Sequence, residues 1–203
     1  MFRRFIDSPY TLWVLLALPS AGFLAALLSG TPGPQGQPVS HMLLHPTGEF
    51  SARFMIIAMI LTPMRMIFPN SGFWRWMMKR RRYFGVAAGL YAVFHTVLYI
   101  VDMQTLQAIL SDALHFGIWT GWLAMLIFVP LLLTSNDYFV RRMGPAWKTL
   151  QRWTYAAAVL TLLHWIFVHN NLGPALVHFL PLAGLEAYRI YRNRSRAQDR
   201  VAA

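Results

Sequence analysis

The sequence contains seven histidines and no cysteine, so imidazole is the main side chain available for binding a transition metal or a metal cofactor. The lack of cysteine excludes disulfides, thiolate zinc sites, cysteine-ligated iron–sulfur clusters and thiol nucleophiles. No H-E-x-x-H motif of a zinc hydrolase occurs, and no helix offers the Glu-x-x-His set of a di-metal site. Neutral imidazole is, however, a good ligand for heme iron.

Two of the histidines, His95 and His164, lie at matching depths in two predicted membrane spans. His95 lies 13 residues after Arg82, and His164 lies 12 residues after Arg152. At the rise of an α-helix, both imidazoles are roughly 18–20 Å from the same membrane boundary. This pair suits the two axial ligands of a heme iron lying between the helices, a ligation that favours electron transfer over oxygen activation. The alternative is that each histidine only hydrogen-bonds a neighbouring helix.

Arg53 is the one basic residue predicted to lie toward the outer end of a span. A guanidinium can hold a heme propionate with two parallel hydrogen bonds. Equally, Arg53 could pair with Glu49, four residues earlier, or extend to the membrane interface. An interfacial role is predicted for four further histidines: His41, His45, His115 and His169. The role of His178, about one turn into the last span, is ambiguous.

The composition requires that these residues be positioned inside a membrane. Hydrophobic residues make up 57% of the 203 and charged residues 12%, against about a quarter in soluble domains. The net charge of +11 would suit a nucleic-acid-binding protein, but long apolar stretches separate the basic clusters. Basic clusters between apolar spans are typical of the cytoplasmic face of a membrane protein. The sequence therefore predicts an integral membrane protein with no nucleic-acid partner.

Six stretches are long enough to cross a bilayer, which takes about 20 apolar residues per helix. The first is not expected to be a cleaved signal peptide, because its apolar run is long and no small-x-small site ends it. The predicted fold is a single all-α, six-transmembrane-helix bundle, followed by a basic cytoplasmic tail over 189–203. The spans are predicted over 9–28, 48–68, 83–101, 116–134, 150–168 and 174–188.

The distribution of Lys and Arg predicts the orientation of these spans. With six spans, 17 of the 18 basic residues, beginning with Arg3 and Arg4, fall on one side of the membrane, and Arg53 is the exception. Positive loops face the cytoplasm, so both termini are predicted to be cytoplasmic. No nucleotide-binding motif or internal repeat is present, so any chemistry must take place in the membrane or at its surface.

Several short motifs in fixed order resemble one known family. The chain is similar to the MsrQ (YedZ) family, the heme-binding membrane subunit of the periplasmic methionine-sulfoxide reductase system, within the ferric-reductase-like transmembrane group. The similarity covers about residues 41–190. The motifs are His45-Pro46-Thr47-Gly48, Leu61-Thr62-Pro63-Met64-Arg65, Arg81-Arg82-Tyr83-Phe84-Gly85, His95-x-x-x-Tyr99, Thr134-Ser135, Gly144-x-x-Trp147-x-x-Leu150-x-Arg152-x-x-Tyr155 and His164.

The resemblance implies a b-type heme protein of the bacterial inner membrane, an electron-transfer subunit rather than a catalytic one. It implies that electrons come from membrane quinol and leave to a periplasmic molybdopterin-dependent methionine-sulfoxide reductase, with FMN as a further cofactor. His95 and His164 match the family's histidines in the third and fifth helices.

One position departs from the family pattern. Gln151 stands where the family commonly has histidine, and Arg81 or Arg82 would stand at the partner position for a cytoplasmic-side heme. The resemblance therefore implies a single heme in the outer half of the membrane. A flavin or a quinol would then bridge the distance to the cytoplasmic face. Four arginines could hold an FMN phosphate: Arg75, Arg80, Arg141 and Arg152. The positive charge expected of cytoplasmic loops explains them equally well.

Two other functions are compatible with the sequence. The first is a ferric-reductase-like heme protein with a different acceptor or partner, which the change at Gln151 leaves open. The second is a non-redox six-helix membrane protein whose histidines serve only in packing, although inverted repeats and paired broken helices of a transporter are lacking.

Overall fold

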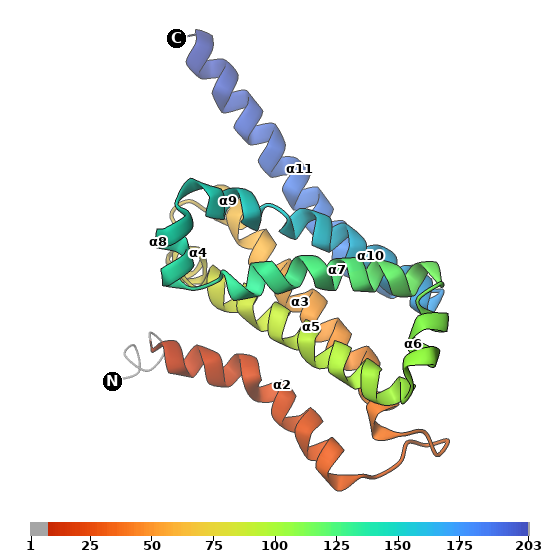
Figure 1. Cartoon of the computed structure of the whole chain (residues 1–203). Coiled ribbons are helices and arrows are strands. Elements are labelled where there is room, and N and C mark those ends of the chain that lie inside the picture. The colour runs from red at the N-terminus through yellow and green to blue at the C-terminus, as the bar shows by residue number, and fades with distance from the viewer. Residues whose placement is uncertain (1–7, 203) are drawn as a thin grey trace.

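The computed structural model describes residues 8–202, and every regular element in this range is an α-helix. Arg3 and Arg4 lie outside the described residues. The six long helices are α2 (Pro9–Ser29), α3 (Val39–Ile67), α5 (Arg81–Met103), α7 (Phe116–Leu133), α10 (Thr154–His169) and α11 (Leu172–Ala202) (Figure 1). Four short helices connect them: α4 (Gly72–Lys79), α6 (Leu106–Asp112), α8 (Asp137–Met143) and α9 (Pro145–Gln151).

Each predicted span overlaps one long helix, but the helices differ in their suitability for a membrane. Within the described chain, α2, α3, α5 and α7 are long and apolar enough to cross a bilayer. Helix α10 has 16 residues, and α11 has 31 but carries many arginines in its C-terminal half. The all-α membrane fold is therefore confirmed in class, while the count of six spans stays a prediction.

Helix α3 begins nine residues before the predicted start of the second span. The His45-Pro46-Thr47 segment, expected to be an entry loop, lies inside the helix. Pro46 lacks an N–H and would normally interrupt a helix. The Thr47 hydroxyl donates to the Leu43 carbonyl at 2.6 Å in the same turn. This bond braces the turn that contains Pro46, while the carbonyl that loses its N–H partner is that of Met42.

Two further boundaries differ from the prediction. The predicted fifth span starts at 150, whereas α9 ends at Gln151 and α10 begins at Thr154. The tail predicted over 189–203 continues α11 without a break to Ala202. No glycine or proline follows Gly184 to stop that helix, and its residues are mostly good helix formers.

The bundle consists of two closely packed helix pairs, α3 with α5 and α7 with α10, and α11 packs against α3. Alanines are buried in the middle of these contacts and let the backbones approach closely. Helix α2 lies at the edge of the bundle, where Tyr91 of α5 donates to the Leu16 carbonyl at 3.1 Å. The buried alanines of the described residues are Ala52, Ala58, Ala87, Ala88, Ala124, Ala157, Ala158 and Ala175.

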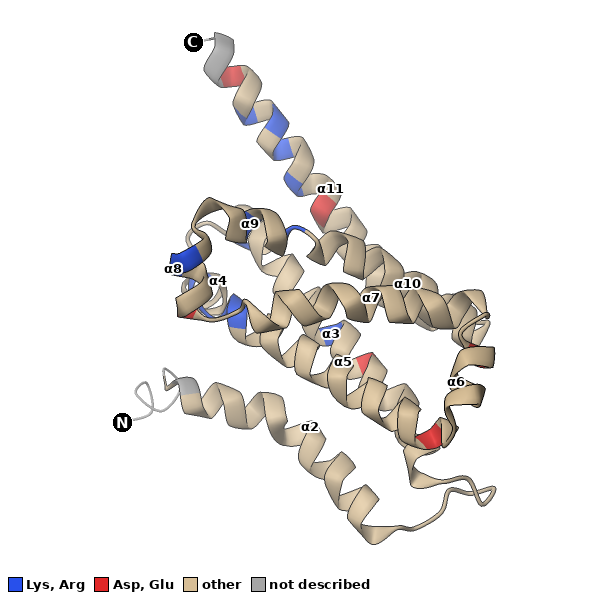
Figure 2. Cartoon of the chain, viewed as in Figure 1, with Lys and Arg blue, Asp and Glu red and all other residues tan. Residues whose placement is uncertain are grey.

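Charge is separated along the bundle, as Figure 2 shows. Lys and Arg gather at the end that carries α4, α8 and α9 and continue along the C-terminal part of α11. At this end Arg82 pairs with the exposed Asp137, and its hydrogen bond lowers the pKa of that carboxyl. At the opposite end, Asp102 lies in the last turn of α5 and Asp112 ends α6. The separation fits the predicted orientation, which stays a prediction.

Candidate functional site

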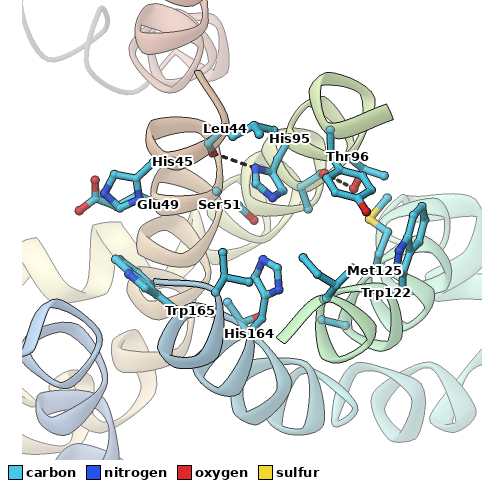
Figure 3. Close-up of a pocket in the computed structure, with 18 of the residues that line it drawn as sticks. Leu44, His45, Glu49, Ser51, His95, Thr96, Trp122, Met125, His164 and Trp165 are labelled. Atoms are coloured by element: carbon cyan, nitrogen blue, oxygen red, sulfur yellow. Dashed lines mark hydrogen bonds between the residues drawn. The ribbon is translucent and has the colours of Figure 1, made fainter. Parts of the chain in front are cut away.

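His95 of α5 and His164 of α10 face each other across an internal cavity, as Figure 3 shows. Their ring centroids are 6.1 Å apart and the ring planes are 80° apart. The cavity has a volume of about 270 Å³ and is lined mainly by residues of α3, α5, α7 and α10. The structure thus brings together the two histidines that helix depth selects from the sequence.

One ring nitrogen of each histidine is held by the backbone of another helix. His95 Nδ1 donates to the Leu44 carbonyl of α3 at 2.9 Å, and His164 Nδ1 donates to the Gly117 carbonyl of α7 at 2.7 Å. A proton fixed on Nδ1 leaves Nε2 with its lone pair, which is the arrangement of a metal-ligating histidine. In the described part of the chain neither Nε2 has a hydrogen-bond partner, so these two atoms are available to a metal.

The spacing of the two rings fits a single metal ion between them. An imidazole nitrogen lies roughly 2 Å from a first-row metal, so two imidazoles on opposite sides of one ion have ring centroids roughly 6 Å apart. The observed 6.1 Å agrees with this separation. The cavity walls are mostly apolar and aromatic, as suits a large flat cofactor. They include Trp122, Met125, Phe128 and Trp165, with Gly48 and Gly121 beside the histidines.

Arg53 does not line this cavity. It pairs with Glu49 at 2.5 Å, and its Nε donates to His178 Nε2 at 3.2 Å. The i,i+4 ion pair between Arg53 and Glu49, which the sequence analysis gave as an alternative to a propionate contact, is therefore present. Because α3 starts at Val39, Glu49 lies ten residues inside the helix rather than at its edge, next to Gly48. A contact between Arg53 and a heme propionate stays a prediction.

Three histidines assigned to the interface also reach the cavity: His41, His45 and His169. His41 pairs with Asp102 at 2.9 Å, and the rings of His45 and His169 are 4.6 Å apart. His41, His45 and Gly48 are spaced so that they share one face of a helix. That signal was present in the sequence, but it requires a helix that starts before His41. His115 and His178 do not line the cavity.

At the basic end of the bundle, the side chains at the positions where a second heme would need histidines have other partners. Gln151 donates to the Leu131 carbonyl at 3.4 Å, and Arg81 donates to the Thr62 hydroxyl at 3.4 Å. Both side chains are thus used in contacts between helices.

A helical membrane bundle with a half-buried pair of opposed histidines defines a class of protein, and the sequence comparisons agree with that class. Residues 47–162 match the family described as the ferric reductase like transmembrane component. No solved structure matches the chain.

Three relatives carry the name protein-methionine-sulfoxide reductase heme-binding subunit MsrQ. The one from Rhizobium meliloti (strain 1021) is 33% identical over 192 residues, covering 92% of this chain and 85% of the relative. Those from Brucella melitensis biotype 2 and Brucella ovis are each 31% identical over 187 residues, covering 89% of this chain and 83% of the relative. The chain belongs to the MsrQ family.

Proposed function

We propose that this chain is a b-type heme electron-transfer subunit of a methionine-sulfoxide reductase system, with His95 and His164 as the axial ligands of the iron. The observation that carries the proposal is the opposed pair of imidazoles, which line one cavity and each have Nδ1 bound to a backbone carbonyl of another helix. A bound heme supplies a reversible one-electron couple at the iron. The relatives' printed names, which call them heme-binding subunits, support the same cofactor.

The chain's own groups then have definite tasks. The Leu44 and Gly117 carbonyls hold the two imidazoles in one tautomer and one orientation, which raises their basicity as ligands. Two imidazole ligands would leave no exchangeable position on a heme iron held by His95 and His164, which would favour electron transfer over oxygen activation. The apolar side chains of the cavity, among them Phe128 and Trp165, exclude water from the pair.

We infer a single heme. Gln151 stands where a second ligand would be needed and is hydrogen-bonded to Leu131, while the partner position offers arginine. All seven histidines belong to the described chain, and none of them lies in α8 or α9 at the cytoplasmic end.

The electron donor and acceptor are proposed from the family. Membrane quinol supplies the electrons, and the acceptor is a periplasmic molybdopterin-dependent methionine-sulfoxide reductase subunit. This assigns the chain to the bacterial inner membrane as a multi-pass protein with both termini in the cytoplasm. Four apolar helices and the separation of charge support that location.

FMN binding is proposed at the cytoplasmic end. Arg75 and Arg80, together with Arg65 and Lys79, line a pocket beside α4. Arginine and lysine suit a phosphate group, and no acidic residue lines that pocket. Arg141 and Arg152, also considered from the sequence, are not part of it.

A second candidate is a heme protein of the same transmembrane class with a different acceptor. Gln151 favours it, because a chain that has lost one histidine of the family pattern could have changed its partner as well. Electron transfer to a purified methionine-sulfoxide reductase, compared with transfer to ferric chelates, separates the two.

The test is a reduced-minus-oxidised spectrum of the purified protein, with heme measured per chain. We expect one low-spin b-type heme in the wild-type protein. His95→Ala and His164→Ala should each lower heme content roughly 10-fold or more, because removal of a ligand costs more than removal of an outer-shell partner. His115→Ala is the control, since that side chain is 75% exposed and outside the cavity. Normal heme content in both cavity variants would reject the ligand assignment.

A further inference from the structure

Each of the two cavity histidines packs against a glycine of a neighbouring helix. A Cβ built on Gly48 of α3 would lie 3.2 Å from His95 Cε1 and Nδ1. A Cβ built on Gly121 of α7 would lie 2.6 Å from His164 Nδ1 and 2.8 Å from its Cε1. Real Cβ atoms essentially never lie within 3.0 Å of another heavy atom of this kind. The His164 ring would therefore have to move if residue 121 were alanine.

The same two glycines stand in a fixed relation to the carbonyls that hold the histidines. Leu44, which accepts from His95, lies four residues before Gly48. Gly117, which accepts from His164, lies four residues before Gly121. In an α-helix the carbonyl of residue i−4 and the side chain of residue i lie on the same face.

This relation explains why the position must be glycine. A helical carbonyl already accepts the N–H four residues later, and these two also accept from the Thr47 hydroxyl at 3.0 Å and the Thr120 hydroxyl at 2.7 Å. Each imidazole therefore shares a crowded carbonyl and must approach it from the side. That approach passes over residue i, where a Cβ would stand in the path. Without a Cβ at Gly48 or Gly121, an imidazole from the next helix can reach the carbonyl.

From this geometry we infer that Gly48 and Gly121 are positioning residues for the two axial histidines. Each forms, with the carbonyl four residues earlier, a socket that takes up one imidazole. One socket lies in the α3–α5 pair and the other in the α7–α10 pair, the two most extensive helix contacts of the bundle. Each helix pair thus presents one imidazole to the space between the pairs (Figure 3). The inference rests on the proposed heme.

The sockets should affect the reduction potential of the heme as well as its binding. The carbonyl bond and the ring orientation set the basicity of each imidazole and hence the reduction potential of the iron. A variant that keeps both histidines but alters a socket should therefore change the potential and the spin state.

The experiment compares four glycine-to-alanine variants of the full-length protein, purified with heme. Gly121→Ala and Gly48→Ala alter the two sockets. Gly89→Ala is the matched control for tight packing alone, since its Cβ would lie 3.1 Å from a Leu132 side-chain atom and touches no histidine. Gly85→Ala is the control for open space, because nothing lies within 4 Å of its Cβ. Heme per chain, spin state by electron paramagnetic resonance and midpoint potential are measured for each.

We expect Gly121→Ala to lose roughly 10-fold or more in heme affinity or to yield high-spin heme, as happens when an outer-shell partner is lost. Gly48→Ala, with the longer contact, should retain heme with an altered potential. Both controls should match the wild-type protein. A wild-type spectrum and potential in Gly121→Ala, or the same change in Gly89→Ala, would overturn the inference.

Gly48→Ala decides the matter if Gly121→Ala does not fold: an altered potential supports the sockets, and an unaltered one rejects them. The wild-type measurement separates this inference from the proposed function. A wild-type protein without low-spin heme rejects both, whereas low-spin heme that tolerates Gly121→Ala rejects the sockets alone.

Discussion

His95 and His164 differ from the other histidines in the hydrogen bond that each Nδ1 makes. Both donate to a backbone carbonyl of another helix, whereas the Nδ1 atoms of His115 and His178 bond carbonyls only three or four residues away in sequence. A bond between helices fixes the ring relative to the bundle and not merely to its own helix. His41 Nδ1 also bonds another helix, but its partner is the Asp102 carboxylate. The bond to a backbone carbonyl of another helix is what distinguishes the proposed ligand pair.

Arg53 provides a test at the same scale. If its partner is Glu49, Arg53→Ala and Glu49→Gln should couple in a double-mutant cycle of unfolding free energy by about 1 kcal/mol or less, because the guanidinium is 43% exposed. Heme content and potential should change no more in Arg53→Ala than in Glu49→Gln. Loss of heme in Arg53→Ala but not in Glu49→Gln would instead establish the propionate contact.

At the scale of helices, the α7–α10 pair depends on close approach of two backbones. A Cβ at Gly117 would lie 3.0 Å from the Val168 nitrogen and 3.1 Å from the Phe167 carbonyl carbon. Backbone atoms cannot move aside as a side chain can. Gly117 therefore serves both as the acceptor for His164 and as the point where α7 touches α10.

The prediction for this pair is that Gly117→Ala destabilises the protein by about 1–3 kcal/mol, the usual cost of an overpacked contact. The measurement is unfolding in detergent followed by circular dichroism. Gly22→Ala in α2, where nothing lies within 4 Å of the added Cβ, is the control and should unfold as the wild-type protein does. Equal stability of the two variants would show that α7 and α10 can separate without cost.

At the scale of the whole molecule, the separation of charge defines two ends with different tasks. The basic end has the pocket beside α4, and the residues at the opposite end that line the cavity include His41 and Asp102.

The orientation can be tested with single cysteines, because the natural chain has none. Gln35→Cys, between α2 and α3, should react with a membrane-impermeant maleimide added to intact spheroplasts. Asn70→Cys, between α3 and α4, and Asn193→Cys, in α11, should react only after the membrane is opened. Labelling of both Gln35→Cys and Asn193→Cys in intact spheroplasts would mean an odd number of spans and would contradict the count of six, whereas labelling of Asn193→Cys without Gln35→Cys would contradict the orientation.

Local features of the sequence were sufficient for the membrane class, for the approximate helices and for the selection of His95 and His164. Hydropathy and helix rise act over neighbouring residues, so they can be read without a fold. The same locality explains the errors. Proline and histidine in 45–47 indicated a loop, whereas the turn is stabilised by Thr47 and by the packing of α3 on α5.

Only the tertiary structure decided the partners of the site. His95 meets a carbonyl 51 positions away and His164 one 47 positions away, and no periodicity in the sequence specifies which helix lies opposite which. For Arg53, the packing of α11 on α3 adds His178 as a hydrogen-bond partner beside Glu49. The sequence by itself selected the residues that could bind a heme and predicted their depth. Packing of the helix pairs determined that the two imidazoles face each other and that glycines stand beside them.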